Sequence, residues 1–298
     1  MHRVAYHWKK QFLNRVCIQG GTILTNAVFL NNDRKMPLLG LGVYKATGEN
    51  EAENAIISAV KCGYRMIDTA SAYKNEENVG RGIARCGIPR KELFITTKIW
   101  NNAQRLGDVE GAFQRSLDRL GLDYIDLYLI HWPVPGCYLS TWKEMEKILS
   151  SGRALSIGVS NFEIRHLEEL RRVSGIVPAV NQIECHPLCY PKELIDYCQA
   201  NGIQVQAYAP LARGAYLDHD VLCVMGTKYA HTPAQVGLRW AVQKGISGIP
   251  KSVHPDRIES NANIFDFSID QEDMDLLDTL NENYHSASVP EDLQGVMF

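Results

Sequence analysis

The feature of this sequence that most restricts its fold is an alternation, repeated eight times, of a short β-rich run with a helical pattern. The predicted strands are 38–43, 65–68, 93–98, 125–130, 154–159, 179–184, 203–208 and 246–250. Between two of them, residues 108–120 place their apolar side chains on one helical face. Strands separated by helices pair in parallel through right-handed crossovers. The alternation therefore predicts a parallel α/β fold.

The boundaries of the predicted helices carry the residues that usually end and begin helices. Thr232 precedes Pro233 with the spacing of an amino-terminal cap, and Ser268 has capping-box spacing before a late helix. A glycine, which can adopt a left-handed cap, stands between a helical pattern and the next strand at Gly63, Gly121, Gly152, Gly202 and Gly245.

Eight strands in this order favour a single-domain, closed (β/α)₈ TIM barrel. The open doubly wound alternative needs a glycine-rich phosphate turn after its first strand, but Lys45 stands where the third glycine belongs after Gly40 and Gly42. A length of 298 residues allows one barrel or two smaller domains. No segment rich in Pro, Gly and Ser divides the chain, which favours one domain.

Composition excludes several classes of protein. Lys and Arg number 31 against 34 Asp and Glu, giving a net charge of −3, so we expect no nucleic-acid partner. No apolar run is long enough to cross a bilayer, so we expect no membrane association. The eight cysteines form no C-x-x-C pair, and the cluster 185–189 is interrupted by a proline, so we expect reduced thiols, a cytoplasmic location and no metal.

Residues 1–21 form a separate, basic amino-terminal extension. No Asp or Glu occurs before Asp33, and apolar residues recur every four positions from Val4 to Val16. We interpret this segment as an extension preceding a barrel over 22–298. An organelle transit peptide is the alternative interpretation.

Polar side chains recur where the predicted strands end, and the carboxyl ends of barrel strands are where such folds place their chemistry. Asp68 ends the second strand with Tyr73 five residues later, Lys98 ends the third, and His131 follows the fourth. Taken singly, Asp68 could cap a helix, Lys98 could be a lysine whose ammonium reaches solvent, and His131 could be a hydrogen-bonded imidazole in the core. Together, Asp68, Tyr73, Lys98 and His131 predict an active site. We interpret the adjacent charged run 74–77 as the solvent-exposed start of a helix.

Five strings then show a resemblance to a known family. They are Gly-Tyr-Arg-Met-Ile-Asp-Thr-Ala at 63–70, Ile-His-Trp-Pro at 130–133, Ile-Gly-Val-Ser-Asn-Phe at 157–162, Val-Asn-Gln-Ile-Glu at 180–184 and Ile-Pro-Lys-Ser at 249–252. In order and spacing they resemble the signatures of the aldo-keto reductase superfamily, from about residue 22 to 267. The chain is most similar to microbial members that reduce diketo-gluconate and trypanosomatid members that form prostaglandin F. The resemblance implies the same barrel.

The resemblance also implies a catalytic tetrad of Asp68, Tyr73, Lys98 and His131. Carbonyl reduction needs a hydride on carbon and a proton on oxygen, and Tyr73 is expected to be the general acid. Lys98 is expected to stabilise its phenolate and bring its pKa towards the working range, with Asp68 pairing with Lys98. Neutral His131 is expected to orient the substrate oxygen.

The remaining motifs are similar to a cradle for NADPH/NADP⁺. Ser160, Asn161 and Gln182 match contacts to the nicotinamide carboxamide. Tyr208 matches the aromatic ring that stacks on the nicotinamide, and Leu211 continues the same loop towards the pyrophosphate. The 2′-phosphate and adenine contacts match Lys251, Ser252, Arg257 and Asn261. Two departures, Ser260 for a usual Glu and Ala209 for a usual Ser, put one adenine contact and the tightness of cofactor binding in doubt.

The expected substrate-binding residues are Tyr44, Trp100 and Trp132, whose aromatic rings favour small aldehydes and ketones, including keto-sugars. The partner is then a small-molecule carbonyl, and we expect a monomer, with a dimer as the alternative. A second hypothesis is a regulatory or structural member of the same fold that binds NADPH without turnover. The tetrad favours the enzyme.

Overall fold

The computed structural model describes residues 26–295, so the predicted extension over 1–21 lies outside the described residues. At the centre of the fold eight parallel strands form one sheet, in the order β10-β9-β8-β7-β6-β5-β4-β3. The strands are β3 (Leu41–Gly42), β4 (Met66–Asp68), β5 (Phe94–Ile99), β6 (Leu127–Ile130), β7 (Ile157–Ser160), β8 (Val180–Glu184), β9 (Gln204–Tyr208) and β10 (Ser247–Gly248). Each of the eight predicted runs overlaps one of them.

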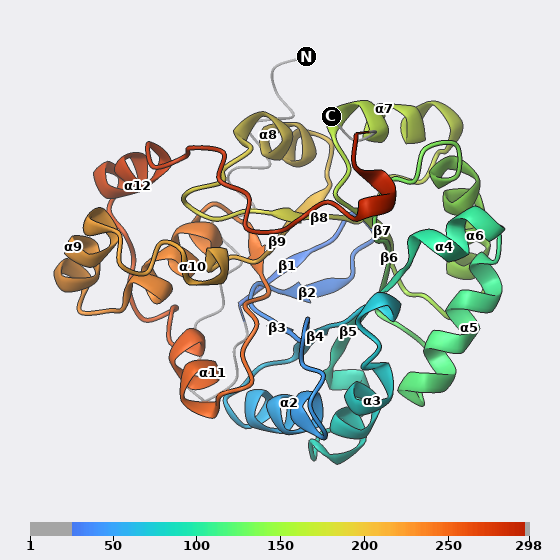
Figure 1. The fold of residues 1–298 in the computed structure, drawn as a ribbon, viewed down its shortest axis with the longest axis horizontal. Coiled ribbons are helices and arrows are strands. Elements are labelled where there is room, and N and C mark those ends of the chain that lie inside the picture. Colours follow the sequence, from blue (N-terminus) through green and yellow to red (C-terminus); the bar gives the residue numbers. More distant parts are fainter. Residues whose placement is uncertain (1–25, 296–298) are drawn as a thin grey trace.

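The first and last strands of this sheet also meet. The Gly40 N–H donates to the Gly248 carbonyl at 2.9 Å, and the Gly248 N–H donates to the Leu38 carbonyl at 2.8 Å. A third bond joins the Gly42 N–H to the Pro250 carbonyl at 3.1 Å. The sheet thus closes into the predicted (β/α)₈ barrel, and helices surround it (Figure 1).

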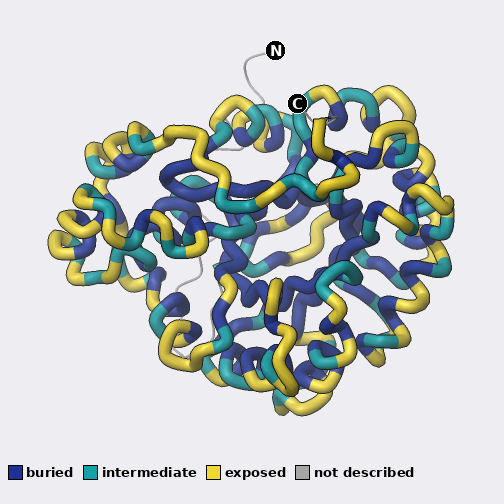
Figure 2. Tube along the Cα trace, in the orientation of Figure 1, coloured by how far each residue is buried: buried dark blue, intermediate teal, exposed yellow. Residues whose placement is uncertain are grey.

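The helices cover the outside of the barrel, with buried inner faces and exposed outer faces (Figure 2). They are α2 (Glu51–Lys61), α3 (Glu76–Arg85), α4 (Asn101–Leu106), α5 (Val109–Leu120), α6 (Tyr138–Ser150), α7 (Ile164–Val173), α8 (Lys192–Ala200), α9 (Asp220–Tyr229), α10 (Pro233–Gln243), α11 (Pro255–Ala262) and α12 (Gln271–Asp278). Strands such as β6 are buried on both faces, which is why they are almost continuously apolar in sequence.

The sequence predicted most of the local signals that delimit these helices. All five predicted cap glycines have positive φ, from 63° at Gly121 to 91° at Gly63. Thr232 caps α10, as predicted, and also forms a reciprocal capping box with Gln235. The expected cap at Ser268 is wrong, because α12 begins two residues later, at Gln271, and Asp270 is its capping position.

Two further segments lie across the ends of the barrel. An antiparallel hairpin of β1 (Ala27–Phe29) and β2 (Lys35–Pro37), which the sequence analysis did not predict, contacts the segments before β7 and β8 through Asn31 and Asn32. It therefore lies at the amino ends of the strands. At the carboxyl ends, the terminal segment runs beside β8 (Figure 1) and reaches α4, where Asp292 pairs with Arg105.

The described part of the chain contains neither a membrane-spanning helix nor a cluster of metal-binding side chains. No helix within residues 26–295 is long and apolar enough to cross a membrane. Among the same residues, no group of three or more His, Cys, Asp and Glu side chains could hold a metal ion.

Candidate active site

The four residues of the predicted tetrad lie together at the carboxyl ends of three neighbouring strands. Asp68 ends β4, Lys98 lies near the end of β5, His131 follows β6, and Tyr73 ends the short 3₁₀ turn η1 (Ser71–Tyr73) after β4. The order β4, β5, β6 in the sheet makes these ends adjacent. The fold therefore brings together residues that are up to 63 positions apart in sequence.

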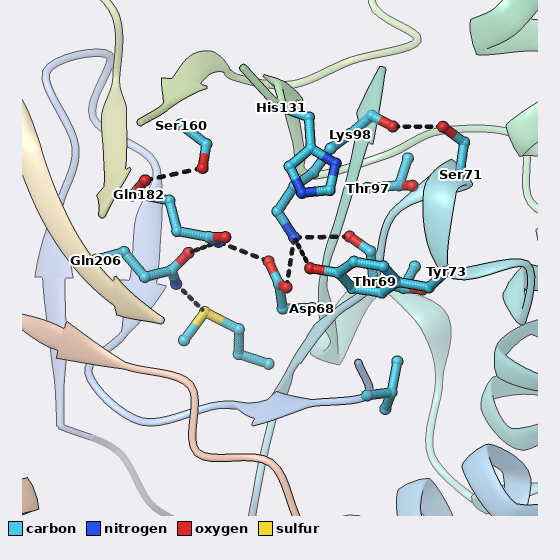
Figure 3. Close-up of polar contacts among 12 residues, drawn as sticks. Asp68, Thr69, Ser71, Tyr73, Thr97, Lys98, His131, Ser160, Gln182 and Gln206 are labelled. Carbon is cyan, nitrogen blue, oxygen red and sulfur yellow. Dashed lines mark hydrogen bonds and ion pairs between the residues drawn. The ribbon is translucent and has the colours of Figure 1, made fainter. Parts of the chain in front are cut away.

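The Lys98 ammonium is the centre of this group (Figure 3). Its Nζ lies 2.5 Å from Asp68 Oδ1, 2.9 Å from the Thr69 carbonyl oxygen and 3.5 Å from the Tyr73 hydroxyl. The Lys98 side chain has no exposed area, and that of Asp68 is 2% exposed. A buried ammonium needs such acceptors, because an unpaired charge costs several kcal/mol away from water.

Burial pulls both members of the Lys98–Asp68 pair towards their neutral forms. It raises the pKa of Asp68 and lowers the pKa of Lys98. The contact between the two residues shifts each pKa in the opposite direction and so partly cancels the effect of burial. A hydrogen bond from Gln182 also lowers the pKa of Asp68, and the charge of Glu76 also raises the pKa of Lys98. The state of the pair thus depends on residues outside the tetrad.

His131 is held neutral at the edge of the group. Burial lowers its pKa well below the ordinary value, and the Lys98 charge lowers it further. Its Nδ1 is buried without a hydrogen-bond partner, and Nε2 has none among residues 26–295. A neutral ring with its proton on Nε2 avoids burying an unpaired N–H at Nδ1 and leaves one donor for a ligand. This agrees with the predicted neutral imidazole.

The prediction that Lys98 brings the pKa of Tyr73 towards the working range is wrong, because burial outweighs the effect of the ammonium. Burial raises the pKa of Tyr73 well above its usual value, and the Asp68 charge raises it further. Asp68 lies against Lys98 and so also offsets the charge of the ammonium, but burial is the larger cause. Tyr73 is consequently a protonated donor at neutral pH, as a general acid must be.

The helix start after Tyr73 is more buried than its charged sequence suggested. Lys74 and Glu77 are exposed, as expected, but Asn75 and Glu76 are each only 1% exposed, so the prediction of a solvated start is wrong for these two. Asn75 accepts a hydrogen bond from Thr69 Oγ1 at 2.9 Å and donates to the carbonyl of Val43 at 2.9 Å. The side chain of Asn75 thus fixes the turn that carries Tyr73.

Glu76 ties the same turn to β5 and to α5. Its carboxylate accepts from Thr97 Oγ1 at 2.7 Å and from Arg119 Nε at 2.7 Å. Thr97 precedes Lys98 in β5, so Glu76 holds the strand next to the ammonium as well as the turn after Tyr73. Neither Asn75 nor Glu76 was among the predicted site residues.

The residues predicted to hold the nicotinamide lie beside the tetrad and contact one another. Asn161 Nδ2 donates to the His131 carbonyl at 3.0 Å, and the Tyr208 hydroxyl donates to Asn161 Oδ1 at 2.8 Å. Ser160 Oγ donates to the carbonyl of Gln182 at 2.8 Å. These bonds fix the rim of the barrel next to His131.

Gln182 has a contact that the sequence did not predict. Its Nε2 donates to Asp68 Oδ2 at 2.7 Å and to Gln206 Oε1 at 2.6 Å (Figure 3). Both protons of the amide are therefore engaged inside the barrel, and Oε1 is the polar atom left to face a ligand. Gln206 itself was missed; its signal is a polar residue two places before Tyr208, where strand alternation puts both on one face.

The loop after Tyr208 is conformationally strained. Ala209, Ala212 and Arg213 have φ of 45°, 47° and 53°, in the left-handed region that non-glycine residues rarely adopt. Such residues cost roughly 1–3 kcal/mol each and persist only where the surroundings enforce them. The Tyr216 hydroxyl, fully buried, donates to the Pro210 carbonyl at 2.8 Å and so holds the loop that includes Leu211.

The residues predicted to bind the adenosine end lie around the start of α11. Lys251 and Arg257 are exposed and have no acidic partner within residues 26–295. The Ser252 hydroxyl is used locally, accepting from the His254 N–H at 3.1 Å, and Asn261 is on the buried face of α11. Two exposed cations without a counter-charge, beside a helix amino terminus, fit a phosphate group.

Two of the three predicted substrate residues contact the tetrad through their rings. The ring centroid of Tyr44 lies 5.0 Å from that of Tyr73, and the Trp100 centroid lies 5.0 Å from that of His131. Trp132 is half-buried, and its ring makes no such contact within the described part of the chain. Tyr44 and Trp100 therefore flank the tetrad.

Comparisons with known proteins agree with this arrangement. The model of the Aldo/keto reductase family matches residues 38–282. A glyoxal reductase from Bacillus subtilis is 49% identical over 272 residues, which are 91% of this chain and 99% of the relative. A 9,11-endoperoxide prostaglandin H2 reductase from Trypanosoma cruzi is 44% identical over 269 residues, covering 89% and 95%.

A solved aldo-keto reductase from Bombyx mori in complex with NADP is 37% identical and superimposes with a TM-score of 0.84 over 90% of this chain and 96% of the other. The family model, over residues 38–282, includes the eight barrel strands and all four tetrad residues. The chain therefore belongs to the aldo/keto reductase family.

Proposed function

We propose that this protein is an NADPH-dependent reductase that converts small aldehydes and ketones to alcohols. The observation that carries the proposal is the position of Lys98 Nζ between Asp68 and the Tyr73 hydroxyl, beside a neutral His131. At the carboxyl ends of neighbouring strands, Tyr73 provides a protonated donor, Lys98 a buried cation and His131 an N–H available to a ligand. Carbonyl reduction requires a proton donor and an oxygen-binding group in that combination.

Each residue has one role in the proposed reaction. A bound reduced nicotinamide supplies the hydride. His131 donates its Nε2–H to the carbonyl oxygen and orients it. Tyr73 transfers its phenolic proton to that oxygen as the alcohol forms, and Lys98, 3.5 Å away, stabilises the phenolate that remains. Asp68 holds Lys98 in place.

Three features support NADPH as the cofactor. Lys251 and Arg257 offer an ammonium and a guanidinium without acidic partners, which suits the extra phosphate that distinguishes NADPH from NADH. Both N–H groups of the Gln182 amide are engaged, which leaves its Oε1 as an acceptor suited to the N–H₂ of a carboxamide. The Bombyx mori relative was solved with NADP.

The aromatic side chains beside the tetrad favour a small carbonyl of mixed polarity. Tyr44 and Trp100 provide flat apolar surfaces beside Tyr73 and His131. Lys45 and Arg213 lie over the Tyr44 ring, 5.6 and 5.9 Å from its centroid, and add the polar part of the mixture. The names of the relatives, a glyoxal reductase and a prostaglandin H2 reductase, indicate two substrates worth testing first.

The test is to follow NADPH and NADH consumption with glyoxal, methylglyoxal, phenylglyoxal, aldoses, diketo-gluconate and prostaglandin H2. We expect turnover with NADPH and at least one dicarbonyl. Tyr73→Phe should lower kcat by about 10²- to 10⁴-fold while NADPH binding, measured by fluorescence, is retained. No oxidation of either cofactor with any carbonyl would instead support a binding protein without turnover.

A further inference from the structure

Gln206 is a fully buried polar residue at the centre of the barrel to which the reaction above gives no role. It lies on β9, directly opposite Gln182 of β8 in the strand register, and two residues before Tyr208. A buried amide without partners would destabilise an apolar core. The polar atoms of the Gln206 amide therefore require hydrogen-bond partners inside the barrel.

Gln206 begins a continuous chain of contacts that ends at the Lys98 ammonium (Figure 3). Gln206 Nε2 donates to Met66 Sδ at 3.4 Å, and Gln206 Oε1 accepts from Gln182 Nε2 at 2.6 Å. Gln182 Nε2 also donates to Asp68 Oδ2 at 2.7 Å, and Asp68 Oδ1 lies 2.5 Å from Lys98 Nζ. Each residue in this chain contacts the next without a gap.

The chemistry of the donors and acceptors permits one orientation of the two amides. An ionised Asp68 only accepts, so the atom of Gln182 that faces it must be the nitrogen. The second N–H of Gln182 then needs an acceptor, which Gln206 Oε1 supplies. The nitrogen of Gln206 is left to face the thioether of Met66, a weak acceptor that does not compete.

We propose that Gln206 is a positioning residue that holds the Gln182 amide in the orientation that donates to Asp68. Through Gln182, it keeps Asp68 aligned with Lys98 and leaves Gln182 Oε1 as the acceptor available to a ligand. This inference rests on the proposed reductase function for its kinetic consequences, whereas its effect on Asp68 is a property of the protein alone.

The decisive variant is Gln206→Met, which keeps an unbranched side chain but removes the acceptor. The matched control is Gln204→Met. Gln204 is also buried on β9, but its amide donates only to the carbonyls of Val205 and Gly245, away from Asp68. Thermal unfolding is measured for both variants, and Gln206→Leu replaces Gln206→Met if the latter does not fold.

The first measurement is the titration of Asp68 in the protein without added cofactor, by NMR of ¹³C-carboxyl-labelled aspartate. The titratable groups around Asp68 are Lys98 on β5 and Tyr73 on η1, with Glu76 and His131 acting through Lys98. Because a hydrogen bond to a carboxylate lowers its pKa, Gln206→Met should raise the pKa of Asp68 by about half a unit to one unit. Gln204→Met should not change it.

Two further measurements separate positioning from a general loss of stability. Gln206→Met should lower kcat about three- to tenfold with the KM values within about twofold, and Gln204→Met should leave kcat unchanged. In a Gln182→Met background, Gln206→Met should have no further effect on the pKa of Asp68, because Gln206 acts through Gln182.

An unchanged Asp68 titration in Gln206→Met, or an equal shift in Gln204→Met or in the Gln182→Met background, would overturn the inference. If the wild-type protein reduces no carbonyl, the proposed function is wrong, and the Asp68 titration still decides the role of Gln206.

Discussion

The Lys98 ammonium lies 2.5 Å from Asp68 Oδ1, and neither side chain is more than 2% exposed. Replacing one member of a buried pair leaves the other charge uncompensated, which costs about 3–5 kcal/mol. We therefore expect Asp68→Asn to lower the free energy of unfolding in urea by that amount. The double variant Asp68→Asn/Lys98→Met should recover most of the stability but no activity. A loss below about 1 kcal/mol in the single variant would contradict the pairing.

Lys251 and Arg257, the two exposed cations around the start of α11, give a prediction about cofactor choice. Charge-assisted hydrogen bonds contribute about 1.5–3 kcal/mol, or roughly tenfold to hundredfold in affinity. Lys251→Ala and Arg257→Ala should each weaken NADPH binding by such a factor and leave NADH binding unchanged. Lys228→Ala is the control, because Lys228 is already paired with Asp273 on another helix. Equal weakening of both cofactors would argue against a 2′-phosphate site.

Gly237 on α10 gives a test of the strained loop after Tyr208. A Cβ at this position would collide with the hydroxyl of Tyr216, which holds the Pro210 carbonyl. Overpacking of this kind costs about 1–3 kcal/mol, more than the gain of about 1 kcal/mol from helix propensity. We expect Gly237→Ala to lower thermal stability and raise the KM for NADPH.

Tyr216→Phe should reproduce the rise in KM without the steric clash, because it removes only the hydroxyl. Gly175→Ala is the matched control, since a Cβ there meets no atom within 4 Å. A KM for NADPH that stays at the wild-type value in both Gly237→Ala and Tyr216→Phe would show that the loop does not depend on this contact.

Glu184 anchors the carboxyl-terminal segment and gives a prediction about pH. Burial alone would raise the pKa of Glu184, but hydrogen bonds from His186, Ser286 and His285 outweigh it and lower the pKa from 4.5 to about 2. The main contacts are the Ser286 N–H at 2.8 Å and its hydroxyl at 2.5 Å. The folded state therefore favours the charged carboxylate.

A lowered carboxyl pKa contributes stability that is complete above the ordinary value and is lost as the pH falls towards the folded value. Between about pH 4.5 and pH 2, the wild type should lose about 2–3 kcal/mol more unfolding free energy than Glu184→Gln. Asp196→Asn, which removes an exposed carboxylate, should behave like the wild type. Equal losses in the wild type and Glu184→Gln would contradict the anchoring role.

The barrel and the tetrad could be predicted from the sequence because both depend on local patterns. Buried parallel strands are almost continuously apolar, and the polar residues that end them, such as Asp68 and His131, stand out against that background. Parallel pairing then places those ends at one rim. The hairpin over β1 and β2 was missed because it pairs only three residues on each strand.

The tertiary structure decided the environment of each of these residues. Burial of Tyr73 and the charge of Asp68 raise the pKa of Tyr73, whereas Lys98 alone was expected to lower it. The burial of Glu76 and the contact between Gln182 and Gln206 depend on which elements pack together. A sequence pattern fixes which residues reach the rim of a barrel, but their charge states and hydrogen bonds depend on solvent exclusion and on neighbours from distant strands.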